Sequence, residues 1–73
     1  MLLNDVQKKT IQLMHEGESV TFGGVAVGMT KRYEVHRLAE KGFKVGEYEL
    51  LIRLRSDQVE SAEEVILFIE GRI

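Results

Sequence analysis

The chain has 73 residues, a net charge of −2 and no cysteine. Because a chain of this length holds one modest core, we expect residues 1–73 to form a single domain without a deep, enclosed active site. The lack of cysteine excludes disulfides, thiolate metal sites and cysteine nucleophiles.

No segment of the sequence has the pattern of a targeting signal or a membrane span. The apolar start, Met1-Leu2-Leu3, is shorter than the apolar region of a signal peptide and is followed at once by polar Asn4. The longest apolar run covers residues 65–69, whereas a membrane span needs about 18 residues. We therefore expect a cytoplasmic protein that does not bind membranes.

A helix is predicted over residues 5–16. Asn4 can accept a hydrogen bond from the amide of Gln7, whose side chain can reach back, and this is a capping box. Residues of the expected buried stripe recur at helical spacing, at Val6, Thr10, Leu13 and Met14. Gly17 can adopt the left-handed conformation that closes a helix.

The pattern of residues 19–29 predicts a β-hairpin. Apolar residues alternate with other residues on both sides of Gly23-Gly24, at Val20, Phe22, Val25, Val27 and Met29. Two adjacent glycines supply the positive φ angles of a tight two-residue turn. Gly28 predicts a bulge in the second strand.

Residues 30–46 admit two interpretations. In the first, which we favour, a short helix spans about residues 35–41 and is closed by Gly42. In the second, the preceding strand continues through Tyr33 and Val35 and ends in an irregular loop.

Residues 47–55 predict one continuous strand with one face on the core and one face in water. Tyr48, Leu50, Ile52 and Leu54 take the first face, and Glu47, Glu49, Leu51, Arg53 and Arg55 take the second.

Residues 61–70 also admit two interpretations. Ser61-Ala62-Glu63-Glu64 is a capping box, which favours a helix. The run Val65-Ile66-Leu67-Phe68-Ile69 is rich in β-branched and aromatic residues, which favours a strand buried on both faces. We favour the strand, followed by a turn at Gly71.

These elements predict an α+β fold in which an N-terminal helix packs on a small antiparallel sheet of about four strands. The sheet is either open or closed into a partial barrel. The expected core consists of Val6, Leu13, Val20, Phe22, Val25, Val27, Leu50, Ile52, Leu54, Val65, Leu67 and Ile69.

The sequence lacks the residue patterns of catalytic, metal and cofactor sites. His15 and His36 are the only histidines, and neither has partners at metal-ligand spacing. The glycines at 23, 24 and 28 match neither a dinucleotide-binding fingerprint nor a phosphate-binding loop. We therefore expect a non-catalytic chain without a cofactor that binds other protein chains, with an oligomer as one form of that binding.

A nucleic-acid-binding regulator is the alternative function. Residues 31–55 carry seven basic groups against four acidic groups, in a chain that is acidic overall. The basic residues are Lys31, Arg32, Arg37, Lys41, Lys44, Arg53 and Arg55.

Two stretches together resemble the small head–tail joining proteins, or connector proteins, of tailed bacteriophages. The first is the hairpin 19–28. The second is the pair 50–57, which ends in Arg-Ser-Asp, and 65–72, which ends in Gly-Arg. The sequence departs from that family at Ala62-Glu63-Glu64, where a Gly-Asp turn is typical, and it stops at Ile73, where such proteins usually add another strand.

The resemblance implies a protein of virion assembly that docks on phage connector or tail proteins through sheet edges and loops. It implies contacts at the hairpin tip, Gly23 and Gly24, and in the loop 36–46, where we single out His36 and Phe43.

Overall fold

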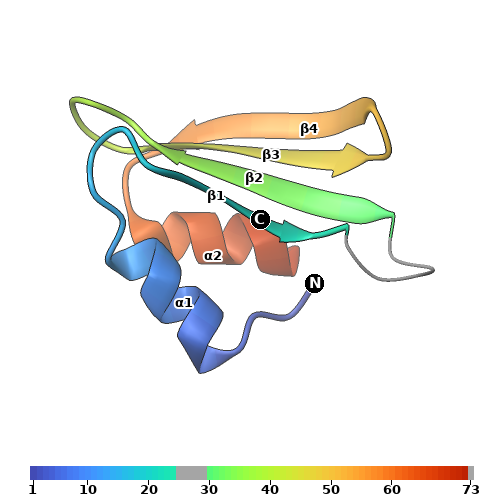
Figure 1. Cartoon of the computed structure of the whole chain (residues 1–73), viewed down its shortest axis with the longest axis horizontal. Coiled ribbons are helices and arrows are strands. Elements are labelled where there is room, and N and C mark those ends of the chain that lie inside the picture. The colour runs from blue at the N-terminus through green and yellow to red at the C-terminus, as the bar shows by residue number, and fades with distance from the viewer. Residues whose placement is uncertain (25–29, 73) are drawn as a thin grey trace.

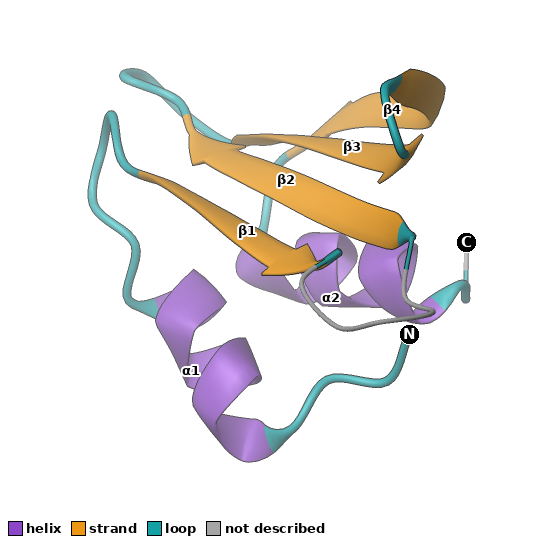
Figure 2. Cartoon of the chain, turned by 45° about the vertical axis from the view of Figure 1, so that its right-hand side comes forward, coloured by secondary structure: helices purple, strands orange, loops and turns teal. Residues whose placement is uncertain are grey.

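The computed structural model describes residues 1–24 and 30–72. Its elements follow in the order α1 (Asp5–Gln12), β1 (Ser19–Gly23), β2 (Lys31–Arg37), β3 (Phe43–Glu49), β4 (Ile52–Val59) and α2 (Ala62–Glu70). The strands form one antiparallel sheet in the order β1-β2-β3-β4, so each strand pairs with the next one in sequence. Both helices lie on one side of this sheet (Figures 1 and 2). The predicted α+β class is confirmed, and the sheet is open rather than closed into a barrel.

The core lies between the sheet and the helices. Buried apolar side chains from both layers form one cluster: Leu3, Ile11, Phe22, Tyr33, Val35, Phe43, Val45, Val59, Val65, Ile66, Phe68 and Ile69. We call the sheet face that carries this cluster the covered face. No described element lies on the opposite side, which we call the open face (Figures 1 and 2).

Helix α1 begins where the sequence predicts and ends earlier. Asn4 Oδ1 accepts from the Gln7 amide at 2.8 Å, so the predicted capping box is confirmed. The helix ends at Gln12, and Ile11 is its buried residue, whereas Val6 and Leu13 are exposed. The prediction of Val6 and Leu13 as core residues is wrong because the buried stripe passes through Ile11, which lies on a different side of the helix.

The first two strands do not meet in a tight turn at Gly23-Gly24. Phe22 pairs with Tyr33 and Gly23 pairs with Arg32, so the predicted two-residue turn is wrong. Strand β2 also corrects the predicted helix at 35–41, and it agrees with the second interpretation of that segment. The segment is a strand because its buried residues alternate: Tyr33 and Val35 are buried, and the residues on either side of each are more exposed.

Three features predicted for residues 25–29 lie outside the described residues. They are the second strand of the expected hairpin, the bulge at Gly28, and the core positions Val25 and Val27.

The predicted strand 47–55 is in fact a hairpin. Glu49 pairs with Ile52, so the chain reverses at Leu50-Leu51, and the two halves of the expected strand belong to β3 and β4. The register of β3 and β4 shifts by one residue after Glu47. Glu47 pairs with Arg55, but Tyr48 pairs with Arg53, so Leu54 has no partner on β3. Leu50, Ile52 and Leu54 are therefore exposed, which corrects their assignment to the core.

The last element is a helix, so the predicted strand at 65–69 is wrong. The Ser61 hydroxyl accepts from the Glu64 amide at 3.2 Å, and Gly71 closes the helix with a φ of 75°. The β-branched run is compatible with a helix here because α2 packs between β3 and α1, which bury most of its side chains. Tertiary packing therefore outweighs the strand propensity of these residues.

Candidate functional site

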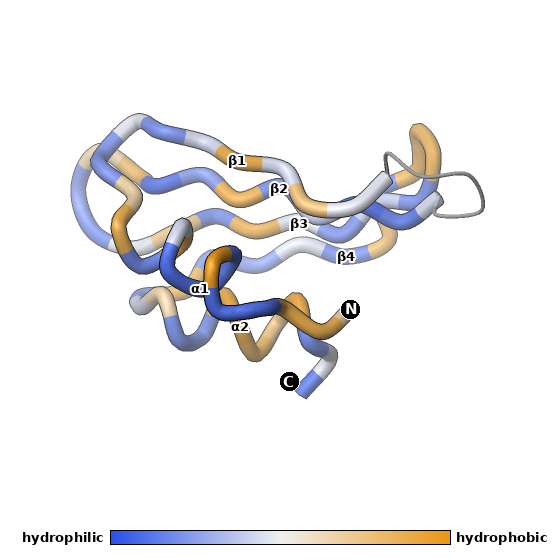
Figure 3. Tube along the Cα trace, turned by 60° about the horizontal axis from the view of Figure 1, so that its bottom comes forward, coloured by the Kyte–Doolittle hydropathy of each residue, from blue (hydrophilic) through white to orange (hydrophobic). Residues whose placement is uncertain are grey.

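Four exposed aliphatic residues follow one another closely in the β3–β4 turn and the start of β4, and we call them the apolar tip. Their exposed fractions are 64% for Leu50, 95% for Leu51, 67% for Ile52 and 47% for Leu54. Figure 3 shows this turn as a hydrophobic loop at one end of the sheet. Single exposed aliphatic residues are common, but a contiguous group of them on a small domain is typical of an interaction site.

Thr30 and Arg32, at the start of β2, hold the backbone of Leu50 in place. The Leu50 amide donates to the Thr30 carbonyl at 3.2 Å, and Nη1 of Arg32 donates to the Leu50 carbonyl. Leu50 has a φ of 55°, in the left-handed region, which costs a leucine about 1–2 kcal/mol. The turn thus presents Leu50 in a conformation that glycine or asparagine adopts more easily.

Most side chains on the described part of the open face are polar. Strand register places four rows of side chains on it, contributed by Ser19 and Thr21 of β1, Arg32, Glu34 and His36 of β2, Lys44, Gly46 and Tyr48 of β3, and Arg53, Ser56 and Gln58 of β4. With histidine neutral, three basic groups and one acidic group give this face a charge of +2, whereas the whole chain carries −2. The open face is thus the positive side of the molecule.

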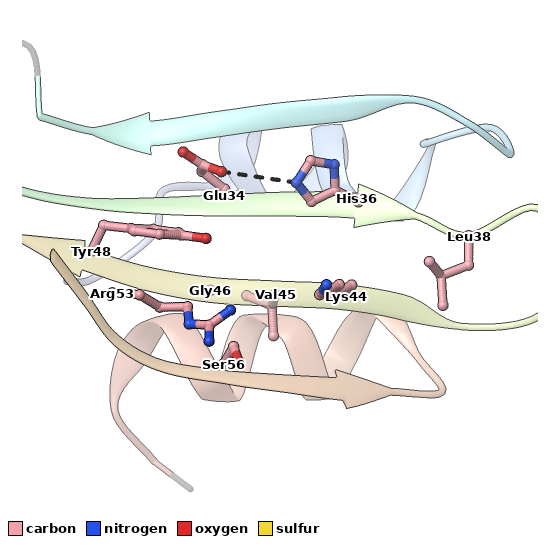
Figure 4. A pocket seen from close by; sticks show the side chains of 9 residues that line it. All are labelled: Glu34, His36, Leu38, Lys44, Val45, Gly46, Tyr48, Arg53 and Ser56. Atoms are coloured by element: carbon pink, nitrogen blue, oxygen red, sulfur yellow. Dashed lines mark ion pairs between the residues drawn. The ribbon is translucent and has the colours of Figure 1, made fainter. Parts of the chain in front are cut away.

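A hollow of about 290 Å³ lies in the open face around Gly46. Its wall is formed by Glu34, His36, Leu38, Lys44, Val45, Tyr48, Arg53 and Ser56 (Figure 4). The missing side chain of Gly46 leaves room that the Tyr48 ring partly fills, since a Cβ atom at position 46 would lie 2.9 Å from Cε1 of Tyr48.

An ion network around buried Glu47, on the covered face, holds two of the predicted basic residues. Glu47 accepts from the Tyr33 hydroxyl at 2.7 Å and from Nε of Arg55 at 2.9 Å, and Lys31 Nζ lies 3.6 Å away. Arg55 also donates to the Phe68 carbonyl of α2 at 2.7 Å. The hydrogen bond from Tyr33 is the main cause that lowers the pKa of Glu47, and Arg55 and Lys31 add to it. Burial, followed by the bond to Glu47, raises the pKa of Tyr33 to about 12.

The seven predicted nucleic-acid-binding residues are therefore divided by the sheet. Arg32, Lys44 and Arg53 gather on the open face. The remaining four lie elsewhere: Lys31 and Arg55 contact Glu47, Arg37 lies against the Phe43 ring, and Lys41 is in the exposed β2–β3 connection.

The structure does not bring the four predicted protein-binding residues together. Gly23 and Gly24 lie at the end of β1 and have φ angles of 81° and 74°. His36 is exposed on the open face, beside the opposite end of the sheet. Phe43 is buried in the core and contributes no exposed surface.

The apolar tip was missed because its residues imitate a half-buried strand. Leu51 is the one residue that indicates an exposed apolar site, since it is an aliphatic residue on the otherwise charged face of the predicted strand 47–55. No glycine, proline, asparagine or aspartate marks the turn at Leu50-Leu51, and those residues are the usual indication of a reversal.

Metal-ligand clusters and membrane-spanning helices are both absent from the described residues. No group of three or more histidine or acidic side chains there is placed to hold a metal ion. No helix in the described part of the chain is long and apolar enough to cross a membrane. Comparison of the chain with protein-family models, curated proteins and solved structures found no match.

Proposed function

We propose that this chain is a non-catalytic interaction module that binds another protein through the apolar tip. The observation that carries the proposal is the exposure of four aliphatic residues in the β3–β4 turn and the start of β4, where Thr30 and Arg32 hold the turn in place. A preorganised apolar anchor loses little conformational entropy on binding, so more of its burial energy contributes to affinity. Interfaces are dominated by a few such anchors.

The edge of the sheet next to the tip adds a second means of contact. β4 is the last strand in the sheet order, so its outer edge has no partner strand in the described structure. An extended segment of a partner can pair with such an edge while its side chains cover the tip. Pairing with the β4 edge would suit an assembly interface. The head–tail joint of a phage particle, which the sequence resemblance implies, is one such interface and stays a prediction.

The test is capture of partners from a lysate of the native host by a tagged chain, read by mass spectrometry. We expect Leu51→Asp to lose the captured partner, because removal of an anchor costs about 2 kcal/mol or more, roughly 30-fold in affinity. Val6→Asp is the control, since Val6 is also an exposed aliphatic residue but lies on α1. Equal capture by wild type and Leu51→Asp would contradict the proposal.

The folded state of both variants is checked by urea denaturation. Because Leu51 and Val6 are both largely exposed, we expect their free energies of unfolding to stay within about 0.5 kcal/mol of wild type. A loss of capture by Leu51→Asp at unchanged stability therefore reports on binding.

A further inference from the structure

We propose that the open face binds the phosphate groups of a single-stranded nucleic acid, with one phosphate seated in the hollow around Gly46. This site uses different residues from the apolar tip and does not depend on it. It narrows the nucleic-acid-binding surface predicted from the sequence, because only three of the seven predicted basic residues, Arg32, Lys44 and Arg53, lie on the open face.

Lys44 and Arg53 are the cations that make the hollow attractive to an anion. Neither side chain has a hydrogen bond or ion pair with any described residue, whereas the other arginines of the sheet all contact acidic groups, carbonyls or rings. An unpaired cation on a protein surface keeps its full charge available to a ligand. Two of them border the same hollow.

The sheet register places these cations at opposite ends of the hollow. Lys44 and Tyr48 flank Gly46 along β3, and Arg53 is the partner of Tyr48 on β4. Figure 4 shows the Arg53 guanidinium turned along β4 toward Ser56 and Gly46. Ser56, which pairs with Gly46 and also lines the hollow, adds a hydroxyl donor. A phosphate between Lys44 and Arg53 would therefore meet two charged donors and one neutral donor.

The one carboxylate in the hollow is already neutralised. Glu34 accepts from Nε of Arg32 at 3.2 Å, and its other oxygen lies 3.9 Å from Nε2 of His36. The pair of Glu34 and Arg32 carries no net charge, so the positive charge of Lys44 and Arg53 prevails in the hollow.

The shape of the site favours a nucleic acid strand over a small phosphate ester. Small-molecule pockets enclose most of their ligand, whereas this hollow lies on an uncovered sheet face. A strand compensates for shallow contacts by making several of them along the face. Beside the hollow, the Arg32 guanidinium lies 4.7 Å from the centroid of the Tyr48 ring, and both groups offer planar surfaces on which unpaired bases stack.

The test is the fluorescence anisotropy of a labelled 12-nucleotide oligothymidylate, titrated with the whole chain at several salt concentrations. Single strands give a slope of log affinity against log salt of about −0.7 for each phosphate neutralised. The two unpaired cations, Lys44 and Arg53, therefore predict a slope of about −1.4. We expect the double variant Lys44→Gln/Arg53→Gln to reduce its magnitude by about 1.4 and to lower affinity about tenfold for each cation removed.

A charge-matched control separates the site from net charge. Lys9→Gln/Lys41→Gln removes two exposed cations outside the open face, and we expect wild-type affinity and slope. The uncharged variant Leu51→Ser should also bind the oligonucleotide as wild type does, which keeps this site distinct from the apolar tip.

Four results would overturn the proposal. They are no binding of the oligonucleotide at low salt, equal losses in the two double variants, tighter binding of a duplex of the same length, and displacement of the oligonucleotide by equimolar inorganic phosphate. The third would assign the face to double-stranded nucleic acid, and the fourth would assign the hollow to free phosphate.

Discussion

Gly42 and Gly17 have similar backbone angles in very different surroundings. Their φ values are 95° and 83°, in the left-handed region that side-chain-bearing residues rarely adopt. A Cβ atom at Gly42 would lie 2.5 Å from the carbonyl oxygen of Val59, whereas a Cβ atom at Gly17 would meet nothing within 4 Å. Gly42 therefore combines a conformational requirement with a steric one.

Alanine substitutions should separate these two requirements. We expect Gly17→Ala to cost about 1 kcal/mol, the conformational penalty alone. We expect Gly42→Ala to cost about 3 kcal/mol or more, because the methyl group must also displace the backbone of β4. Urea denaturation of both variants checks this order, and equal costs would show that the contact with Val59 is relieved easily.

At the scale of elements, the capping signals were the most reliable part of the sequence. Asn4 and Ser61 each begin a helix as their side chains predict, because an N-cap bond is local and needs no distant partner. The apolar run 65–69 misled because its strand propensity is smaller than the packing energy of α2 between β3 and α1. Element identity there depends on contacts with distant residues.

The turn at Leu50-Leu51 and the candidate sites could be predicted less well. Strict alternation through residues 47–55 fits one long strand as well as a hairpin, and the turn has no glycine or asparagine. The gathering of Lys44 and Arg53 on the open face depends on register across β3 and β4, which the sequence alone does not specify. The basic segment was visible, but its division between the two faces was not.

The cap of α2 gives the prediction at this scale. Ser61→Ala removes the acceptor for the Glu64 amide, so we expect a loss of about 1 kcal/mol in the free energy of unfolding. Ser61→Asp keeps an acceptor at the same position and adds a favourable charge at the helix N-terminus, so it should retain wild-type stability. Thermal denaturation followed by circular dichroism compares the three proteins. If Ser61→Ala leaves the stability unchanged, water must replace the Ser61 hydroxyl as the partner of the Glu64 amide.

At the scale of the whole molecule, the Glu47 network joins the sheet to α2. Glu47 holds Tyr33 and Arg55 side by side, and Arg55 crosses to α2, where its guanidinium lies 3.9 Å from the centroid of the Phe68 ring. Since Glu47 is almost fully buried, its charge acts where water screens it weakly. The stability of the two layers should therefore depend on the ionisation of this one carboxylate.

The pH dependence of stability follows from the lowered pKa of Glu47. The folded protein holds this carboxylate ionised to a lower pH than the unfolded chain does, so its stabilisation is present above the ordinary glutamate pKa of about 4.3. It is lost as the pH falls through the lower, folded-state pKa. We expect Glu47→Gln to cost about 2 kcal/mol at pH 7 and progressively less on acidification. Urea midpoints of wild type and variant at pH 7 and pH 3 test this, and a constant difference would contradict it.

The position of α2 after all four strands also determines when the chain can fold. Synthesis runs from the N-terminal to the C-terminal side, so the four core residues of α2, Val65, Ile66, Phe68 and Ile69, are added after all four strands. Neighbouring strands of the meander need only short loops to close, but without α2 the part of the covered face that this helix buries stays exposed to solvent. A chain that lacks the residues after 60 would present that face together with unpaired strand edges, the state most prone to aggregation and most in need of a chaperone.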